Sequence, residues 1–82
     1  MNNFTTNLRG VCGYKTVQYF EHTLKVPDNV FWLATDENGE LYGYCEDVPI
    51  DYRSTWSTDS CKYTYLGKIK YTGDWKQSLR EV

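Results

Sequence analysis

Two runs of β-forming residues flank a short turn segment in the middle of the chain. The runs cover residues 30–35, with the sequence VFWLAT, and residues 41–45, with the sequence LYGYC. Segment 36–39 between them reads DENG, in which Asp suits the first turn position and Asn-Gly tolerates positive φ angles. This pattern predicts a β-hairpin at the centre of the fold.

The expected ladder of this hairpin makes both of its faces apolar. If Ala34 pairs with Tyr42 and Trp32 pairs with Tyr44, these four side chains share one face. The other face then carries Phe31, Leu33, Leu41 and Cys45. One face must pack on the core, and the other must be covered by the rest of the domain or by a partner. Trp32, Tyr42 and Tyr44 are therefore candidate partner contacts.

Two further segments have the composition of strands. Residues 14–26 also show helical spacing of apolar side chains, but their β-branched and aromatic content favours a strand, which Pro27 ends. Residues 61–71 alternate between polar and apolar side chains, which predicts a strand with a bulge at Gly67.

The remaining segments complete a single domain of residues 1–82. Residues 1–13 read as a loose arm, and residues 46–60 read as a long polar loop. Asp74 is a candidate N-cap of a short C-terminal helix or turn, and a helix would place Trp75, Leu79 and Val82 on one face. We therefore expect a mostly β, small α+β fold: an antiparallel sheet of about four strands with a central hairpin and a short C-terminal helix.

Length and motifs argue against an enzyme. A chain of 82 residues leaves little room for a substrate cleft, and no phosphate-binding glycine loop or nucleophile motif occurs, so no catalytic residue or cofactor is expected. The residue types of Cys12, His22, Cys45 and Cys61 suit zinc, but their spacing does not, and no metal site is expected. The odd cysteine count, with neither a secretory signal nor a membrane span, predicts reduced thiols in a cytoplasm.

Charge is unevenly placed along the chain. Residues 26–52 carry no Lys or Arg and a net charge of −7, whereas residues 1–25 and 53–82 carry +2 and +3. The acidic residues of this segment are Asp28, Asp36, Glu37, Glu40, Glu46, Asp47 and Asp51. They form either an ordinary solvated surface or an acidic edge for a basic partner, with the five from Asp36 to Asp47 as its charged rim.

Trp56 stands out among the Ser, Thr and Asp residues of the polar segment. Its ring either folds back over the sheet or forms an exposed anchor for a partner, since Trp and Tyr are frequent hot-spot residues. We add it to the candidate partner contacts.

A nucleic-acid interface is the main alternative to a protein interface. Lys62, Lys68 and Lys70 alternate with Tyr63, Tyr65 and Tyr71, and single-strand binders combine such residues. Regular alternation, however, places the lysines and the tyrosines on opposite faces of a strand. The net charge of −2 also argues against nucleic acid as the main partner.

Three segments resemble a group of small tailed-bacteriophage proteins. They are Val26-Pro27, residues 34–44 (ATDENGELYGY) and, after Trp56, residues 74–82 (DWKQSLREV); the likeness covers about residues 20–82. The resemblance implies a protein of the host bacterial cytoplasm that inhibits or redirects a host protein, including a defence component, by stoichiometric binding. It carries over no catalytic residues. The alternatives are a nucleic-acid or nucleotide-binding phage protein and a self-associating structural protein.

Overall fold

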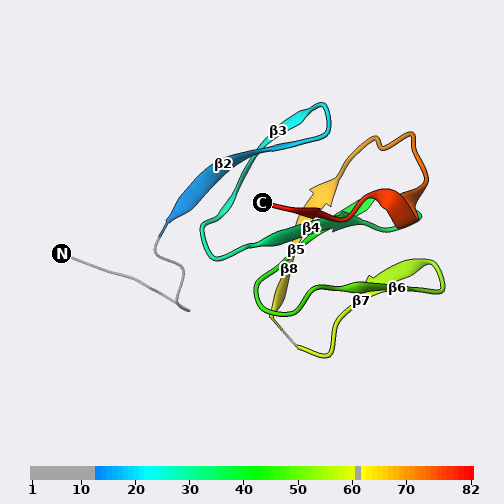
Figure 1. Cartoon of the computed structure of the whole chain (residues 1–82). Helices are drawn as coiled ribbons and strands as arrows, with labels where there is room; N and C mark the ends of the chain where they lie inside the picture. The colour runs from blue at the N-terminus through cyan, green and yellow to red at the C-terminus, as the bar shows by residue number, and fades with distance from the viewer. Residues whose placement is uncertain (1–12, 61) are drawn as a thin grey trace.

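Antiparallel pairing organises every strand in the part of the chain that the computed structural model describes, residues 13–60 and 62–82. A four-stranded sheet has the strand order β8-β5-β4-β9, and two separate hairpins, β2-β3 and β6-β7, flank it (Figure 1). The bounds are β2 Tyr14–Tyr19, β3 His22–Pro27, β4 Trp32–Thr35, β5 Glu40–Tyr44, β6 Ile50–Tyr52, β7 Thr55–Ser57, β8 Tyr63–Lys68 and β9 Arg80–Glu81. The predicted mostly β fold with a four-stranded antiparallel sheet is confirmed.

The central hairpin has the register that the sequence predicts. Trp32 pairs with Tyr44, and Ala34 pairs with Tyr42. At the turn, the Gly39 N–H donates to the Asp36 carbonyl oxygen at 2.9 Å, and Gly39 has a φ of 91°. Glycine adopts this left-handed conformation without steric penalty, so the turn closes at the expected residues.

Residues 14–26 form two strands rather than the single strand predicted. The chain reverses between β2 and β3 at Phe20 and Glu21, with a φ of 55° at Phe20. A bulky residue rarely adopts this conformation, which is why the sequence carries no turn signal there. Tertiary contacts hold it: the Phe20 ring meets the Tyr19 and Tyr71 rings edge-on, with centroids 4.8 and 5.0 Å away, and the Arg80 guanidinium lies 4.4 Å from its centroid.

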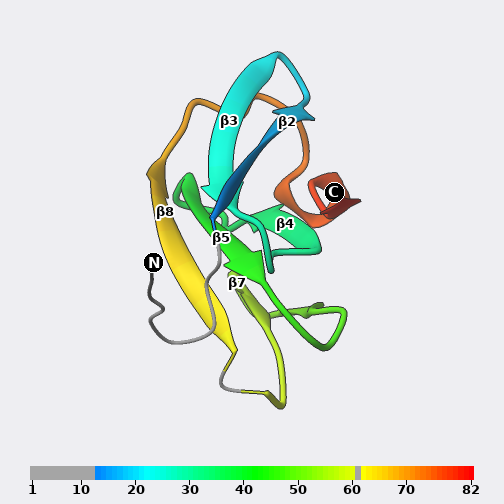
Figure 2. The same cartoon turned by 90° about the vertical axis from the view of Figure 1, so that its left-hand side faces the viewer.

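The core lies between the β2-β3 hairpin and one face of the sheet. Its fully buried side chains are Tyr19, Val26, Val30, Leu33 and Leu41. Figure 1 shows β2-β3 on this side of the sheet and β6-β7 on the other, and Figure 2 shows β3 above β5 and β8. Two different parts of the same chain thus each cover part of one apolar face of the central hairpin, and Phe31 stays 48% exposed.

The C-terminal segment contains one 3₁₀ turn, η2 Trp75–Gln77, where the sequence predicts a short helix or turn. Asp74 is its N-cap, as predicted, and its side chain accepts a hydrogen bond from the Lys76 N–H at 3.0 Å. The turn ends after Gln77, and β9 then pairs with β4. Residues 80 and 81 pair with the edge of β4 and therefore adopt an extended conformation. The apolar residues after Asp74 therefore do not share a helical face.

The predicted polar loop between β5 and β8 contains the short hairpin β6-β7. Its turn includes Arg53, which has a φ of 59°. Ile50 and Tyr52 are largely exposed on β6. The turn lacks Gly, Asn and Pro, so no residue that readily adopts positive φ marks it in the sequence.

The bulge in β8 occurs where the sequence predicts it. The register with β5 shifts between Leu41 and Tyr42, and Gly67 has a φ of 131°. Leu66 is the extra residue, so Lys68 pairs directly with Glu40.

The described residues include no helix long and apolar enough to cross a membrane. The expected N-terminal arm falls almost wholly on residues 1–12, outside the described residues. Cys45 is half-buried, and burial raises the pKa of its thiol.

Candidate functional site: a tyrosine-lined pocket

Cross-strand pairing brings four tyrosines together on the sheet face that points away from the core. Tyr42 pairs with Tyr65, and Tyr44 pairs with Tyr63. The Tyr42 ring lies 5.4 Å from the Tyr65 ring and 5.9 Å from the Tyr63 ring, and Tyr44 lies 6.1 Å from Tyr63. Tyr63 and Tyr65 are 54% and 53% exposed, whereas Tyr44 is buried. We call these four residues the tyrosine cluster.

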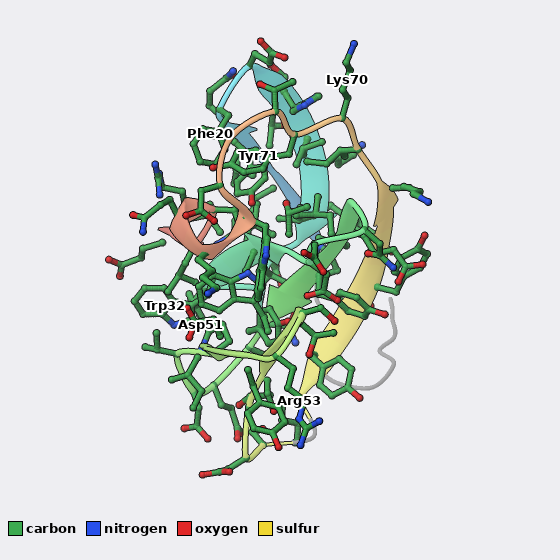
Figure 3. All side chains as sticks on the ribbon, turned by 90° about the vertical axis from the view of Figure 1, so that its right-hand side faces the viewer. Phe20, Trp32, Asp51, Arg53, Lys70 and Tyr71 are labelled. Carbon is green, nitrogen blue, oxygen red and sulfur yellow. The ribbon has the colours of Figure 1, made fainter. Side chains whose placement is uncertain are left out.

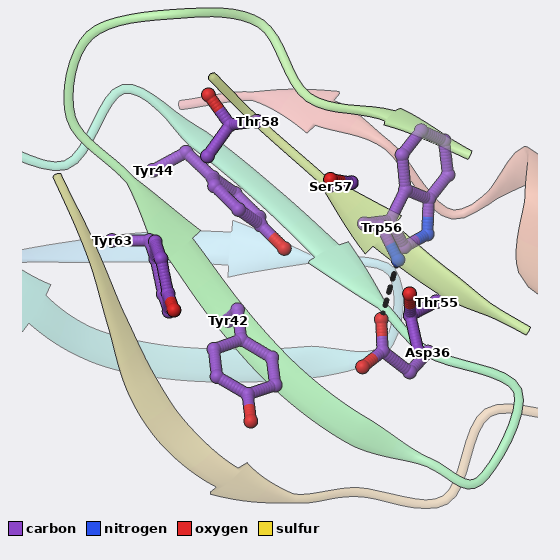
Figure 4. Close-up of a pocket in the computed structure, with 8 residues that line it drawn as sticks. All are labelled: Asp36, Tyr42, Tyr44, Thr55, Trp56, Ser57, Thr58 and Tyr63. Atoms are coloured by element: carbon purple, nitrogen blue, oxygen red, sulfur yellow. Dashed lines mark hydrogen bonds between the residues drawn. The ribbon is translucent and has the colours of Figure 1, made fainter. Parts of the chain in front are cut away.

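A pocket of about 260 Å³ lies between the tyrosine cluster and β7. Eight residues line it: Asp36, Tyr42, Tyr44, Thr55, Trp56, Ser57, Thr58 and Tyr63 (Figure 4). The sheet supplies the tyrosine rings, and the segment that begins with β7 supplies hydroxyl groups and an indole. None of these eight residues is Lys, Arg or His, so the charged group in the lining is a carboxylate.

Trp56 fixes the wall of the pocket opposite the tyrosines. Its indole N–H donates to the Thr35 carbonyl oxygen at 3.0 Å, and its backbone N–H donates to Asp36 Oδ1 at 2.9 Å. The ring meets the Trp75 ring edge-on, with centroids 6.1 Å apart. The Trp56 ring is therefore folded back over the sheet, the first of the two arrangements considered from the sequence, and ties β7 to the end of β4.

Asp36 brings a buried negative charge to the pocket. Its side chain is mostly buried, with 7% of the residue exposed. Desolvation raises the pKa of its carboxyl group and the nearby Glu40 adds to this, while the hydrogen bond from Trp56 opposes it. Burial of a carboxylate favours its neutral form because the charge loses its hydration.

The pKa values of Tyr42 and Tyr44 are both raised, so these two hydroxyl groups stay neutral over the ordinary pH range. Burial raises the pKa of Tyr44 well above its usual value, and the Asp36 charge raises it further. The pKa of Tyr42 is raised by desolvation and then by Glu40 and Asp36. All these shifts disfavour an additional negative charge. The pocket thus offers neutral hydroxyl groups, aromatic faces and one carboxylate, which suits binding of a positive group.

Four of the nine candidate residues from the sequence line this pocket, namely Asp36, Tyr42, Tyr44 and Trp56. Trp32 is half-buried on the same sheet face, opposite Tyr44, but outside the pocket lining. The sequence reasoning considered Tyr63 only for a nucleic-acid interface and left it out of the candidate partner contacts. It also missed the hydroxyl residues Thr55, Ser57 and Thr58, because their segment read as a loop.

The predicted acidic rim divides into two separate groups. Glu37 and Glu40 lie at the turn end of the central hairpin, whereas Glu46 and Asp47 follow the other end of β5. Five residues of strand extend over roughly 15 Å, so the two groups cannot form one contact patch around a small site. Glu46 also accepts a hydrogen bond from the Ser60 hydroxyl at 3.1 Å.

The bulge in β8 changes the predicted placement of one lysine. Residues directly opposite each other on antiparallel strands share a face, so Lys68 lies on the same face as Glu40 and Tyr42. The sequence had placed it on the face away from the tyrosines. Figure 3 shows Lys70 at one end of the molecule and Arg53 at the other. Lys68 is therefore near the tyrosine cluster, while these other two basic residues are spread apart.

Metal ligands do not cluster in the described part of the chain. Within residues 13–60 and 62–82, no three side chains of His, Cys, Asp or Glu come close enough to hold a metal ion. Of the four potential zinc ligands, Cys12 and Cys61 lie outside the described residues.

The sequence matches no protein-family model, and neither a curated protein nor a solved structure is significantly similar to it. The resemblance to tailed-bacteriophage proteins stays a prediction from the sequence, and the geometry of the site is the basis for a functional proposal.

Proposed function

We propose that this protein is a non-enzymatic phage accessory protein that binds a host protein in the bacterial cytoplasm and inhibits or redirects it by stoichiometric contact. The tyrosine cluster forms the centre of the contact surface. The observation that supports this most is the pair Tyr63 and Tyr65, both more than half exposed on a strand and packed against Tyr42. Tyrosine is enriched among the residues that dominate protein–protein binding.

The arrangement of the rings favours tight contact. Each aromatic ring can bury roughly 150–250 Å² of surface, so a few tyrosines provide a large contact area. The rings of the cluster restrict one another's orientations, since they pack across strands at 5.4 to 6.1 Å. The rings are therefore partly ordered before a partner binds, which reduces the side-chain conformational entropy lost on binding.

A tagged pull-down from bacterial lysate, with and without nuclease, tests this proposal. We expect one host protein in near-equal amount that survives nuclease treatment. The double variant Tyr63→Thr/Tyr65→Thr keeps strand-forming residues and should weaken its binding at least about tenfold, as for hot-spot residues.

Two similarly exposed tyrosines outside the cluster supply the matched control. Tyr14 on β2 and Tyr52 on β6 are 64% and 54% exposed. The variant Tyr14→Thr/Tyr52→Thr should retain the host protein. Equal loss in both double variants, or no loss in either, would contradict a contact centred on the tyrosine cluster. Light scattering at low and high salt separates a blank pull-down caused by self-association from a true absence of binding.

A second candidate function is binding of single-stranded nucleic acid. The observation that favours it is Lys68, which the bulge places on the tyrosine face beside exposed rings on which bases could stack. Binding of labelled oligonucleotides that falls steeply with salt and is lost in Lys68→Gln would support this function over the first. Absence of oligonucleotide binding at low salt would rule out this second candidate function.

A further inference from the structure

The pocket behind the tyrosine cluster combines aromatic faces with a buried carboxylate. The rings of Tyr42, Tyr44 and Tyr63 form one side of it, and Asp36 lies on the other (Figure 4). The face of an aromatic ring carries negative electrostatic potential and attracts cations, ammonium groups in particular. The aromatic rings and the carboxylate therefore both favour a cationic ligand.

The Asp36 carboxylate has one of its oxygens committed to the fold. Oδ1 accepts the hydrogen bond from the Trp56 backbone N–H, and Figure 4 shows the second oxygen turned toward the hollow between Trp56 and Tyr42. No basic residue belongs to the described lining of the pocket. A buried carboxylate without a cationic partner is unfavourable, so a cation that enters the pocket offsets part of this cost.

The size of the pocket limits the guest to a small group. Its volume of about 260 Å³ lies below the roughly 300–1,000 Å³ of sites for drug-sized ligands. A headgroup or the end of a side chain fits this space better than a whole nucleotide or cofactor. The hydroxyl groups of Thr55, Ser57 and Thr58 line the rest of it and can accept hydrogen bonds from an ammonium N–H.

We infer that this pocket binds an alkylammonium group, with the rings of Tyr42, Tyr44 and Tyr63 against the cation and the Asp36 carboxylate as its counter-charge. The inference goes beyond the proposed function, because the ligand can also be a free small molecule. A small ammonium compound and a lysine side chain of a bound protein both present an alkylammonium group. It assigns a ligand class to a site that is open in the isolated protein.

Nuclear magnetic resonance titration of the ¹⁵N-labelled protein tests the inference directly. The probes are choline and its neutral isostere 3,3-dimethylbutan-1-ol, which has the same shape without the charge. We expect choline to shift the backbone N–H of Trp56 and Ser57 in a saturable way, with at least about tenfold weaker binding of the alcohol. Equal binding of choline and the neutral alcohol would overturn the inference.

Two variants and one control identify the residues responsible. Asp36→Asn keeps a carbonyl oxygen for the Trp56 N–H but removes the charge, and Tyr42→Leu removes a half-buried ring. Each should weaken choline binding about tenfold, while Tyr52→Leu on β6 should not change it. A dispersed spectrum confirms that each variant is folded. Unchanged affinity in both folded pocket variants would refute this assignment of the site.

Tripeptides distinguish the two sources of the ammonium group. N-acetylated, C-amidated Gly-Lys-Gly and its trimethyl-lysine form present the group only on the lysine side chain, and choline presents it on a free molecule. Binding of a peptide at the same amides indicates a lysine of a partner, and binding of choline alone indicates a small free ammonium compound. Failure of every ammonium probe refutes the pocket inference but leaves the pull-down of a host protein as an independent test of the proposed function.

Discussion

The Tyr19 hydroxyl donates a hydrogen bond to the backbone oxygen of Ser78, 59 residues away in the sequence, at 2.8 Å. Its single proton is used there, so the Thr35 hydroxyl, also at 2.8 Å, donates to Tyr19. The Ser78 hydroxyl in turn accepts the Thr35 backbone N–H at 2.9 Å. This buried network joins the β2-β3 hairpin, the end of β4 and the 3₁₀ turn.

Removal of the Tyr19 hydroxyl should destabilise the fold. Tyr19→Phe leaves the Ser78 oxygen and the Thr35 hydroxyl without this partner inside the core. We expect a loss of about 1–3 kcal/mol in the free energy of unfolding, because buried polar groups without partners are costly. Urea denaturation measures this loss, with the exposed Tyr14→Phe as the control. A loss equal to that of the control would show that the network contributes nothing.

Ser78 and Tyr19 should be energetically coupled. Ser78→Ala removes the acceptor for the Thr35 N–H, and this side chain is fully buried. Its own loss should also be about 1–3 kcal/mol. Residues of one hydrogen-bond network are non-additive by about 0.5–3 kcal/mol, so the double variant should lose less than the sum of the two single losses. Strict additivity in the denaturation data would argue that the two residues act separately.

The approach of Val30 to Gly43 should make this glycine sensitive to any side chain. A Cβ atom at Gly43 would lie 2.9 Å from Val30 Cγ1 and 3.0 Å from Cγ2. Gly43→Ala should therefore lower the free energy of unfolding by about 1–3 kcal/mol through overpacking. Thermal denaturation of Gly43→Ala in the Val30→Ala background provides the check, because the penalty should shrink there. A penalty of the same size in both backgrounds would exclude this steric origin.

The raised pKa of Asp36 should make its charge unfavourable to folding above acidic pH. A carboxyl whose pKa is raised in the folded state from about 3.8 binds more protons when folded. Folding stability therefore falls as pH rises from near 4 through the raised folded pKa and stays lowered above it.

Asp36→Asn should lack this decline. Urea denaturation across acidic to neutral pH should show the variant gaining stability relative to the natural protein as pH rises. The amide oxygen of the variant still accepts the Trp56 N–H, so the two proteins differ at this position mainly in the charge. A relative loss of stability in that direction would mean that the Asp36 charge supports the fold.

Local patterns predicted the parts of the fold that local chemistry controls. The DENG turn, the register of the central hairpin, the bulge at Gly67 and the cap at Asp74 all depend on turn residues or on alternation over a few positions. The reversal at Phe20 and the turn at Arg53 depend on positive φ in residues that rarely adopt it. Distant contacts hold these turns: the Phe20 ring contacts Tyr71 and Arg80, and the Ser54 carbonyl beside Arg53 accepts the Glu37 N–H.

The candidate site divides in the same way. The hairpin pattern was enough to put Tyr42 and Tyr44 on one face, because side chains alternate along a strand whatever surrounds it. Tertiary structure decided that Tyr63 and Trp56 come to the same place, that Asp36 is buried beside them, and that the acidic rim is split. These features depend on which strands pair and on which hairpin covers which face of the sheet. Such choices follow from packing over the whole chain, which no short stretch of sequence specifies.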